Sequence, residues 1–177
     1  MKVVGIAGWS GSGKTTLVVK LVRTLSNRGF SVSTVKHAHH EFDIDQPGKD
    51  SYEHRAAGAR EVLVSSTTRW ALVHEHQGGP ELAVDEVVAR LEPVDLVIVE
   101  GYKHHSHDKI EIHRPALGQP LLAIEDAHIL AVVSDALLKG LAIPVFDRDN
   151  VGAITDFLIA HFGLVGAGSP ARRVQRG

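Results

Sequence analysis

The sequence predicts an α/β protein built around a mostly parallel central sheet. Short apolar segments, typical of strands buried on both faces, recur along the chain and alternate with stretches whose apolar residues fall at helical spacing. Such alternation favours a doubly wound sheet. The length of 177 residues, with 44% apolar and 23% charged side chains, suits one soluble globular domain.

The N-terminal third contains two expected strands and one long helix. Residues 3–7 (VVGIA) form a buried-type strand, and residues 14–28 place leucine and valine at helical spacing. Gly29 is a plausible end of that helix. The alternation in residues 31–36 (SVSTVK) then predicts the second strand.

A polar loop over residues 37–49 separates these elements from a short helix and a hairpin. Asp50 or Ser51 is expected to cap the helix, which ends near Gly58. Residues 61–66 and 69–75 have apolar strand character and are expected to pair across the turn between them. That pairing occurs within one chain or across a dimer.

The second half repeats the alternation of helices and strands. A helix is expected over residues 81–91, closed by Pro93, and buried strands over 95–99 (DLVIV) and 129–133. The remaining expected elements are edge strands over 110–113 and 121–124, a strand over 144–146 and a helix over 150–162. Residues 1–163 are therefore expected to form one domain, and residues 164–177 a flexible tail.

Composition excludes several classes of protein. The absence of cysteine excludes disulfide frameworks, thiolate zinc sites and Fe–S clusters. A formal charge of −2 argues against a nucleic-acid partner, and the apolar runs are too short to cross a membrane, which needs about 20 residues. We expect a cytoplasmic protein. Twelve histidines make its surface charge depend strongly on pH.

The glycine-rich segment carries the strongest functional signal. Residues 8–15 (GWSGSGKT) fit the phosphate-loop pattern G-x-x-x-x-G-K-[ST], and they lie between a buried strand and an amphipathic helix. Backbone N–H groups of such a loop surround phosphates, Lys14 reaches the β and γ oxygens, and the Thr15 hydroxyl binds Mg²⁺. The sequence therefore predicts a three-layer phosphate-loop NTPase fold. The predicted nucleotide contacts in this segment are Gly8, Trp9, Ser10, Gly11, Ser12, Gly13, Lys14, Thr15 and Thr16.

Two acidic residues are candidates for the same metal ion. Glu100 directly follows the apolar strand 95–99, where the carboxyl ends of parallel strands open onto ligands. Asp50 starts the short helix after the second strand, and it serves as a metal ligand, a helix cap or both. We expect Lys14, Thr15 and Glu100 to act in catalysis, and Thr15, Asp50 and Glu100 to bind the metal.

Histidines and lysines cluster after the second strand and after Glu100. The first cluster holds Lys36, His37, His39 and His40, and the second runs from Lys103 to His107. Both are expected at the phosphate-loop edge of a parallel sheet. They are solvated loops, an anion-binding surface to which Lys109 also contributes, or a transition-metal site. The predicted ligand contacts here are His37, His39, His40 and Lys103.

Several segments together resemble the MobB family of molybdopterin-guanine dinucleotide biosynthesis proteins. The resemblance covers most of residues 1–160 and rests on the phosphate loop, TVKHAHH (34–40), GKDS (48–51), AGA (57–59), VEGYK (99–103) and KIEIHR (109–114). It implies a GTP-binding homodimer with slow hydrolysis. Such a protein assists the molybdenum cofactor guanylyltransferase, which joins GMP to molybdopterin. The resemblance also implies Mg²⁺ binding by Thr15, Asp50 and Glu100, and molybdopterin or its guanine dinucleotide as a second ligand.

Base recognition and the alternative functions rest on weaker patterns. The chain has no Asn-Lys-x-Asp run, but Ser134 and Asp135 end the strand 129–133, and a carboxylate there accepts from guanine N1–H and N2–H. Asp135 otherwise caps a following helix. Arg114 and Arg148 are charge-stabilising groups or ordinary salt-bridge partners. The alternative functions are a nickel- or zinc-delivering GTPase that uses the histidine loops, and a small-molecule kinase or ligase.

Overall fold

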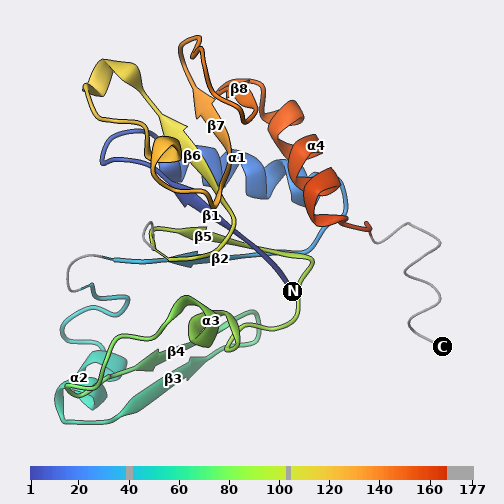
Figure 1. The fold of residues 1–177 in the computed structure, drawn as a ribbon. Helices are drawn as coiled ribbons and strands as arrows, with labels where there is room; N and C mark the ends of the chain where they lie inside the picture. Colours follow the sequence, from blue (N-terminus) through green and yellow to red (C-terminus); the bar gives the residue numbers. More distant parts are fainter. Residues whose placement is uncertain (39–41, 103–104, 167–177) are drawn as a thin grey trace. The chain divides into compact units, whose positions relative to one another are not determined.

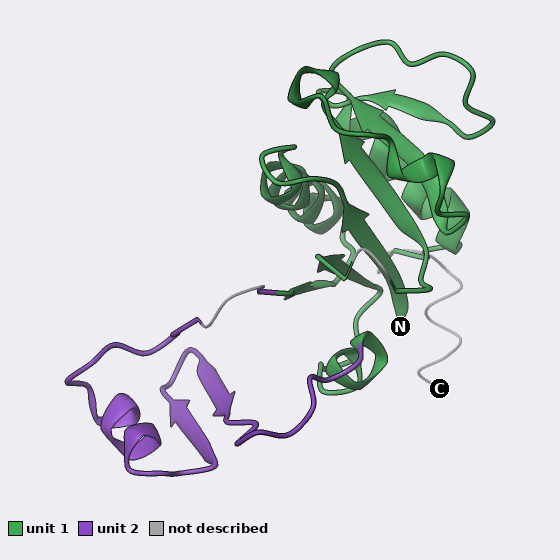
Figure 2. Ribbon diagram, turned by 60° about the vertical axis from the view of Figure 1, so that its left-hand side comes forward, with its two compact units in different colours: residues 1–37, 84–177 green, residues 38–83 purple. Residues whose placement is uncertain are grey.

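The computed structural model describes residues 1–38, 42–102 and 105–166 (Figure 1). The chain divides into two compact units, drawn in different colours in Figure 2: unit 1 comprises residues 1–37 and 84–177, and unit 2 comprises residues 38–83. A compact unit is a finer division than a domain, so the expected domain over residues 1–163 and its tail stay a prediction.

Unit 1 is built on a six-stranded parallel sheet in the order β2-β5-β1-β6-β7-β8. The strands are β1 (Lys2–Ala7), β2 (Val32–Lys36), β5 (Leu96–Glu100), β6 (Lys109–His113), β7 (Ile129–Ser134) and β8 (Val145–Asp147). Because every pairing in this sheet is parallel, all six strands end at the same edge. The segments that follow them meet there.

Helices cover both faces of this sheet. The helices α1 (Lys14–Asn27) and α4 (Val151–Phe162) pack on the face that carries Val4 and Ile6 of β1 (Figure 1). The short helix α3 (Val84–Val88) packs on the other face, against Val97 and Val99 of β5. The result is a three-layer α/β fold with a parallel central sheet, which confirms the predicted fold class.

Four of the expected elements differ in the structure. Residues 109–113 form β6, which lies between β1 and β7 and is no edge strand. Residues 122–124 form a 3₁₀ helix, η2 (Leu122–Ile124), where we expected a strand. The helix α3 is shorter than the range 81–91. The N-cap of α2 is Lys49, one residue before the predicted cap, and no side chain caps it.

Unit 2 contains a short helix and a two-stranded antiparallel sheet. The helix α2 spans Asp50–Ala56, and β3 (Glu61–Ser65) pairs with β4 (Trp70–His74), with Val62 opposite Val73. This confirms the predicted hairpin within one chain. Among the described residues of unit 2, Val62 is the one buried apolar side chain. The hairpin also exposes large apolar side chains, namely Leu63, Val64, Trp70 and Leu72.

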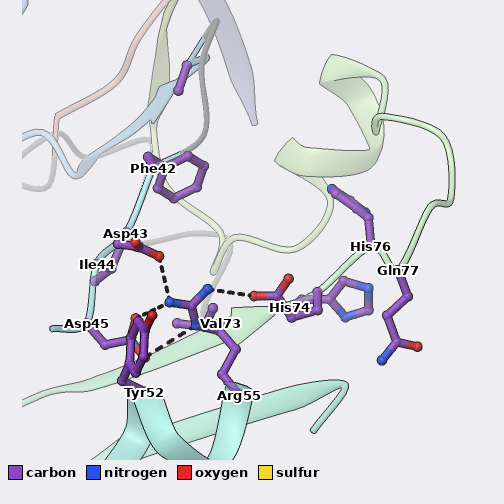
Figure 3. Close-up of a pocket in the computed structure, with 12 residues that line it drawn as sticks. Phe42, Asp43, Ile44, Asp45, Tyr52, Arg55, Val73, His74, His76 and Gln77 are labelled. Carbon is purple, nitrogen blue, oxygen red and sulfur yellow. Dashed lines mark hydrogen bonds and ion pairs between the residues drawn. The ribbon is translucent and has the colours of Figure 1, made fainter. Parts of the chain in front are cut away.

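Arg55 of α2 joins the separate segments of unit 2 (Figure 3). Its Nη2 lies 2.6 Å from Asp43 Oδ1 and 2.9 Å from Asp45 Oδ1, and its Nη1 lies 3.2 Å from Glu75 Oε1. The guanidinium also lies 5.1 Å from the ring centroid of Tyr52. Hydrogen bonding to Asp45 raises the pKa of Arg55 above its ordinary value, although burial opposes that shift. These residues line an open pocket of about 550 Å³.

Candidate functional site

The phosphate loop connects β1 to α1, and its glycines adopt positive φ angles. The φ angles of Gly8, Gly11 and Gly13 are 146°, 76° and 103°. A Cβ atom on Gly8 would lie 2.5 Å from the carbonyl oxygen of Ile112 in β6. Gly8 is therefore required both for its backbone conformation and for the close approach of the loop to β6.

Lys14 and Trp9 tie the loop to itself and to a neighbouring segment. Lys14 Nζ donates to the carbonyl oxygens of Gly8 (2.9 Å) and Trp9 (3.0 Å). The indole Nε1 of Trp9 donates to the carbonyl oxygen of Pro120 at 2.9 Å. Ser12 is buried, and its Oγ has no hydrogen-bond partner among the described residues. Ser10, Thr15 and Thr16 are exposed.

Thr15 and Glu100 meet at the carboxyl edge of the sheet. Glu100 is the last residue of β5 and lies opposite Ile6 of β1, so it ends beside the start of the phosphate loop. Thr15 Oγ1 donates to Glu100 Oε1 at 2.7 Å. A hydroxyl and a carboxylate are oxygen ligands of the kind that Mg²⁺ prefers, so these two residues fit the predicted metal site. Asp50 is the first residue of α2 in unit 2, and its contribution stays a prediction.

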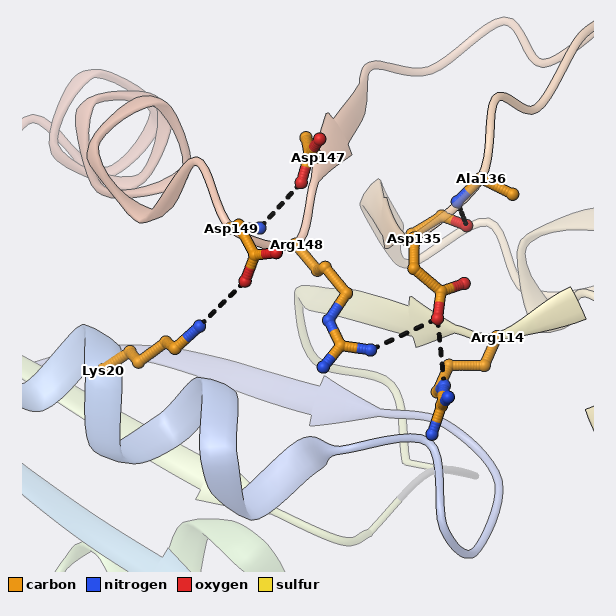
Figure 4. Close-up of polar contacts among 8 residues, drawn as sticks. Lys20, Arg114, Asp135, Ala136, Asp147, Arg148 and Asp149 are labelled. Atoms are coloured by element: carbon orange, nitrogen blue, oxygen red, sulfur yellow. Dashed lines mark hydrogen bonds and ion pairs between the residues drawn. The ribbon is translucent and has the colours of Figure 1, made fainter. Parts of the chain in front are cut away.

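Asp135 holds two arginines at the same edge (Figure 4). Its Oδ2 accepts from Arg114 Nε at 3.0 Å and from Arg148 Nη1 at 3.2 Å, so both arginines form salt bridges. Burial tends to raise the pKa of Asp135, but the two guanidinium groups outweigh it and hold the pKa below its ordinary value. Ser134 Oγ accepts from the N–H of Ala136. Residues 135–144, all described, contain no helix, so Asp135 is no helix cap.

His37, from the histidine cluster that follows β2, lies beside Glu100. Its backbone N–H donates to the carbonyl oxygen of Glu100 at 2.8 Å, and its ring centroid lies 4.5 Å from that of Tyr102. His39, His40 and Lys103 lie outside the described residues.

His107, from the cluster that follows β5, and the nearby Lys109 do not lie at the carboxyl edge of the sheet. His107 packs against the face of the sheet at Gly5, where a Cβ atom would lie 2.4 Å from His107 Nε2. Lys109 is buried at the start of β6, and its Nζ lies 2.7 Å from Asp126 Oδ2. The expectation that His107 and Lys109 surround the phosphate loop is therefore wrong. The segment between β5 and β6 leads away from the edge where both strands end.

Glu111 is not among the predicted site residues, yet it connects to the phosphate loop. This fully buried residue of β6 accepts hydrogen bonds from the backbone N–H groups of Leu122 and Ala123, both at 2.9 Å. The available signal is an acidic residue that lies between two isoleucines in a strand segment.

Residues 1–38, 42–102 and 105–166 contain no group of three or more histidine, aspartate or glutamate side chains placed to hold a metal ion. No helix in these ranges is long and apolar enough to cross a membrane.

Comparison with known proteins settles the family. The family model described as "Molybdopterin guanine dinucleotide synthesis protein B" (MobB) matches residues 3–135. The chain belongs to the MobB family. It is 41% identical over 160 residues to the molybdopterin-guanine dinucleotide biosynthesis adapter protein of Escherichia coli, covering 89% of this chain and 91% of that protein. Identity to the adapter protein of Haemophilus influenzae is 36%, over 88% of this chain and 86% of that protein.

Solved MobB structures share the fold. A MobB homologue from Bacillus stearothermophilus superimposes with a TM-score of 0.66 at 29% identity, over 92% of this chain and 99% of that one. A structure of molybdopterin-guanine biosynthesis protein B gives a TM-score of 0.71 at 28% identity, over 90% and 99% of the two chains. The resemblance inferred from the sequence motifs is confirmed.

Proposed function

We propose that this protein is a GTP-binding adapter with slow GTPase activity that assists the formation or delivery of the molybdopterin guanine dinucleotide cofactor. The names of its E. coli and H. influenzae relatives support the adapter role in that pathway. The observation that carries the nucleotide role is the 2.7 Å contact between Thr15 and Glu100 beside the phosphate loop.

Nucleotide binding requires Lys14 to change its hydrogen-bond partners. Its ammonium group, which donates to the Gly8 and Trp9 carbonyls, would turn to the β and γ phosphates of GTP. Thr15 and Glu100 would hold Mg²⁺, with Asp50 as a further ligand. The ion supplies charge neutralisation on the phosphates. Ser12, whose buried hydroxyl lies inside the loop, is a further donor for a phosphate oxygen.

Slow hydrolysis follows from the groups available at this edge. Phosphoryl transfer needs an in-line water and neutralisation of charge in the transition state. Arg114 and Arg148, which directly follow β6 and β8, are candidates for supplying that charge, but both are paired with Asp135. We expect turnover to stay low in the isolated protein.

Asp135 is the proposed reader of guanine. Both arginines contact its Oδ2, and its Oδ1 would accept N–H groups of the base. The second ligand is molybdopterin or its guanine dinucleotide, contacted by His37, His39, His40 and Lys103. The partner is the molybdenum cofactor guanylyltransferase.

The exposed apolar hairpin supports the proposed homodimer, because exposed apolar patches mark interaction surfaces.

The test is to titrate the protein with GTP or with ATP in the presence of Mg²⁺ and to measure binding by calorimetry. Lys14→Ala should remove most GTP affinity, about 100-fold, because the ammonium pairs with phosphate charge. Lys20→Ala is the matched control, since Lys20 lies on the same helix and pairs with Asp149. Asp135→Asn should weaken GTP more than ATP. Equal GTP binding by wild type and Lys14→Ala would reject the nucleotide role, and tighter binding of ATP would reject guanine reading by Asp135.

A further inference from the structure

A charged side chain is buried in the centre of the sheet without taking part in the proposed chemistry. Glu111 is fully buried in β6, the strand directly beside β1. Burying a carboxylate is costly unless it is well hydrogen-bonded. Its Oε1 accepts from Leu122 N–H and its Oε2 from Ala123 N–H, each at 2.9 Å. Both oxygens are thus committed to a segment that follows eleven residues later in the chain.

These two N–H groups belong to the first turn of η2, where backbone donors have no partner within the helix. The N-cap residue of η2, Leu121, supplies no side-chain hydrogen bond. Glu111 therefore performs the capping from a different element. Because hydrogen bonds to an ionised acceptor are stronger than neutral ones, this contact fixes the start of η2 to β6.

The same short segment holds the phosphate loop. Pro120 lies two residues before Leu122, and its carbonyl oxygen accepts from Trp9 Nε1 at 2.9 Å. The carbonyl oxygen of Trp9 in turn accepts from Lys14 Nζ at 3.0 Å and from Ser12 N–H at 3.2 Å. Hydrogen bonds, together with the backbone of residues 120–123, thus connect Glu111 to Trp9 and Lys14.

We propose that Glu111 is a positioning residue for the phosphate loop, acting through the Pro120–Trp9 hydrogen bond. This deepens the proposed function and rests on it for the choice of ligand, a purine nucleoside triphosphate. When Lys14 turns from the Gly8 and Trp9 carbonyls to a phosphate, the loop loses two of its internal contacts. The indole of Trp9 remains tied to Pro120, and Glu111 keeps Pro120 in place. The loop then retains the shape that binds the phosphates.

Fluorescence of Trp9 tests the positioning directly, without nucleotide. The chain has two tryptophans, so Trp70→Phe leaves Trp9 as the one emitter. In that background, Glu111→Gln should shift Trp9 emission to the red and increase its quenching by acrylamide. Glu125→Gln is the matched control, since Glu125 is exposed in the same segment. Unchanged Trp9 emission in a folded Glu111→Gln protein would overturn the proposal.

A double-mutant cycle on GTP affinity separates positioning from general destabilisation. Glu111→Gln alone should weaken GTP about tenfold, as the loss of a charge-assisted contact implies. In a Trp9→Phe background, Glu111→Gln should cause no further loss of GTP affinity, because the hydrogen bond from Trp9 to Pro120 is already absent. Additive losses would reject the route through Trp9. If wild type binds no GTP, the proposed function fails, and the fluorescence result alone decides the positioning role.

A second variant covers the case in which Glu111→Gln does not fold. Leu122→Pro removes the N–H that Glu111 Oε1 accepts. Proline is tolerated at the first position of a helix, and Leu121 already has φ −69° and ψ 123°, which suits a residue before proline. We expect the same red shift with smaller amplitude, and an unshifted spectrum would count against the proposal.

Discussion

The interactions that stabilise the inside of unit 1 differ from those that stabilise the inside of unit 2. Unit 1 buries leucine, isoleucine and valine from α1, α4 and the sheet in one continuous core, with Leu21 and Ile98 fully buried. Unit 2 has one buried apolar side chain among its described residues and relies on Arg55, which joins three carboxylates from two segments. Apolar packing is spread over many contacts, whereas the Arg55 cluster depends on one residue. A single substitution should therefore affect the two units in different ways.

The largest expected effect is a cavity in the core of unit 1. Leu21→Ala should lower the free energy of unfolding by about 2–5 kcal/mol, because it removes a fully buried side chain from a packed core. Val62→Ala is the counterpart in unit 2 and should cost about 1–2 kcal/mol or less. Chemical denaturation monitored by circular dichroism measures both. An equal cost for the two substitutions would contradict the comparison.

Loss of the Arg55 cluster should act locally. Arg55→Gln leaves Asp43, Asp45 and Glu75 without their shared cation, so amide hydrogen exchange should accelerate within the described parts of residues 38–83. Exchange in β1 and β5 should stay slow. Arg60→Gln is the control, since Arg60 is exposed in the same unit. Uniform acceleration across both units would show that they unfold together.

Arg55→Lys sharpens the same comparison. Lysine keeps the charge but lacks the planar fork that contacts several carboxylates at once. We expect an intermediate rate of exchange in unit 2. A rate equal to that of wild type would mean that charge alone, and not the geometry of the guanidinium, orders this unit.

The smallest expected effect is a pH dependence confined to unit 1. Burial, together with the nearby Lys109 and His105 charges, lowers the pKa of His107 below its ordinary 6.5. In the unfolded chain His107 binds a proton near that ordinary value. As pH falls through 6.5 the unfolded state therefore binds more protons, and stability falls until the pH drops below the folded-state pKa.

The melting temperature should therefore decrease as the pH is lowered from about 7.5 to about 5.5. His107→Leu should flatten this dependence, whereas His128→Gln, at an exposed position, should leave it as in wild type. A wild-type profile that is flat over this range would mean that His107 is solvated.

Local patterns predicted much of unit 1 and the hairpin of unit 2. The phosphate loop, the strand that ends at Glu100 and the 61–75 hairpin depend on residues close together in the chain, and the structure contains all three. The placement of residues 109–113 failed for a physical reason. Lys109 and Glu111 alternate with isoleucine and suggest a half-exposed edge strand.

In the structure, β6 is central because both charges find buried partners far along the chain. Asp126 pairs with Lys109, and the N–H groups of Leu122 and Ala123 pair with Glu111. Those partners come from residues 122–126, a segment that overlaps the strand we expected over 121–124. Arg55 escaped prediction in the same way, since its carboxylate partners lie ten or more residues away. Contacts of this kind depend on the final fold and leave no periodic signal.

The absence of a side chain at Gly5 allows the close approach of His107, which is far from it in the chain. The imidazole of His107 and the Cγ atom of Lys109 occupy the space that a side chain at position 5 would need, since a Cβ atom there would lie 2.4 Å from His107 Nε2 and 2.7 Å from Lys109 Cγ. A larger residue at position 5 therefore requires a smaller one at position 107 and a shifted side chain at Lys109. In a redesign of this protein the two positions have to be changed together, and among its relatives they should covary.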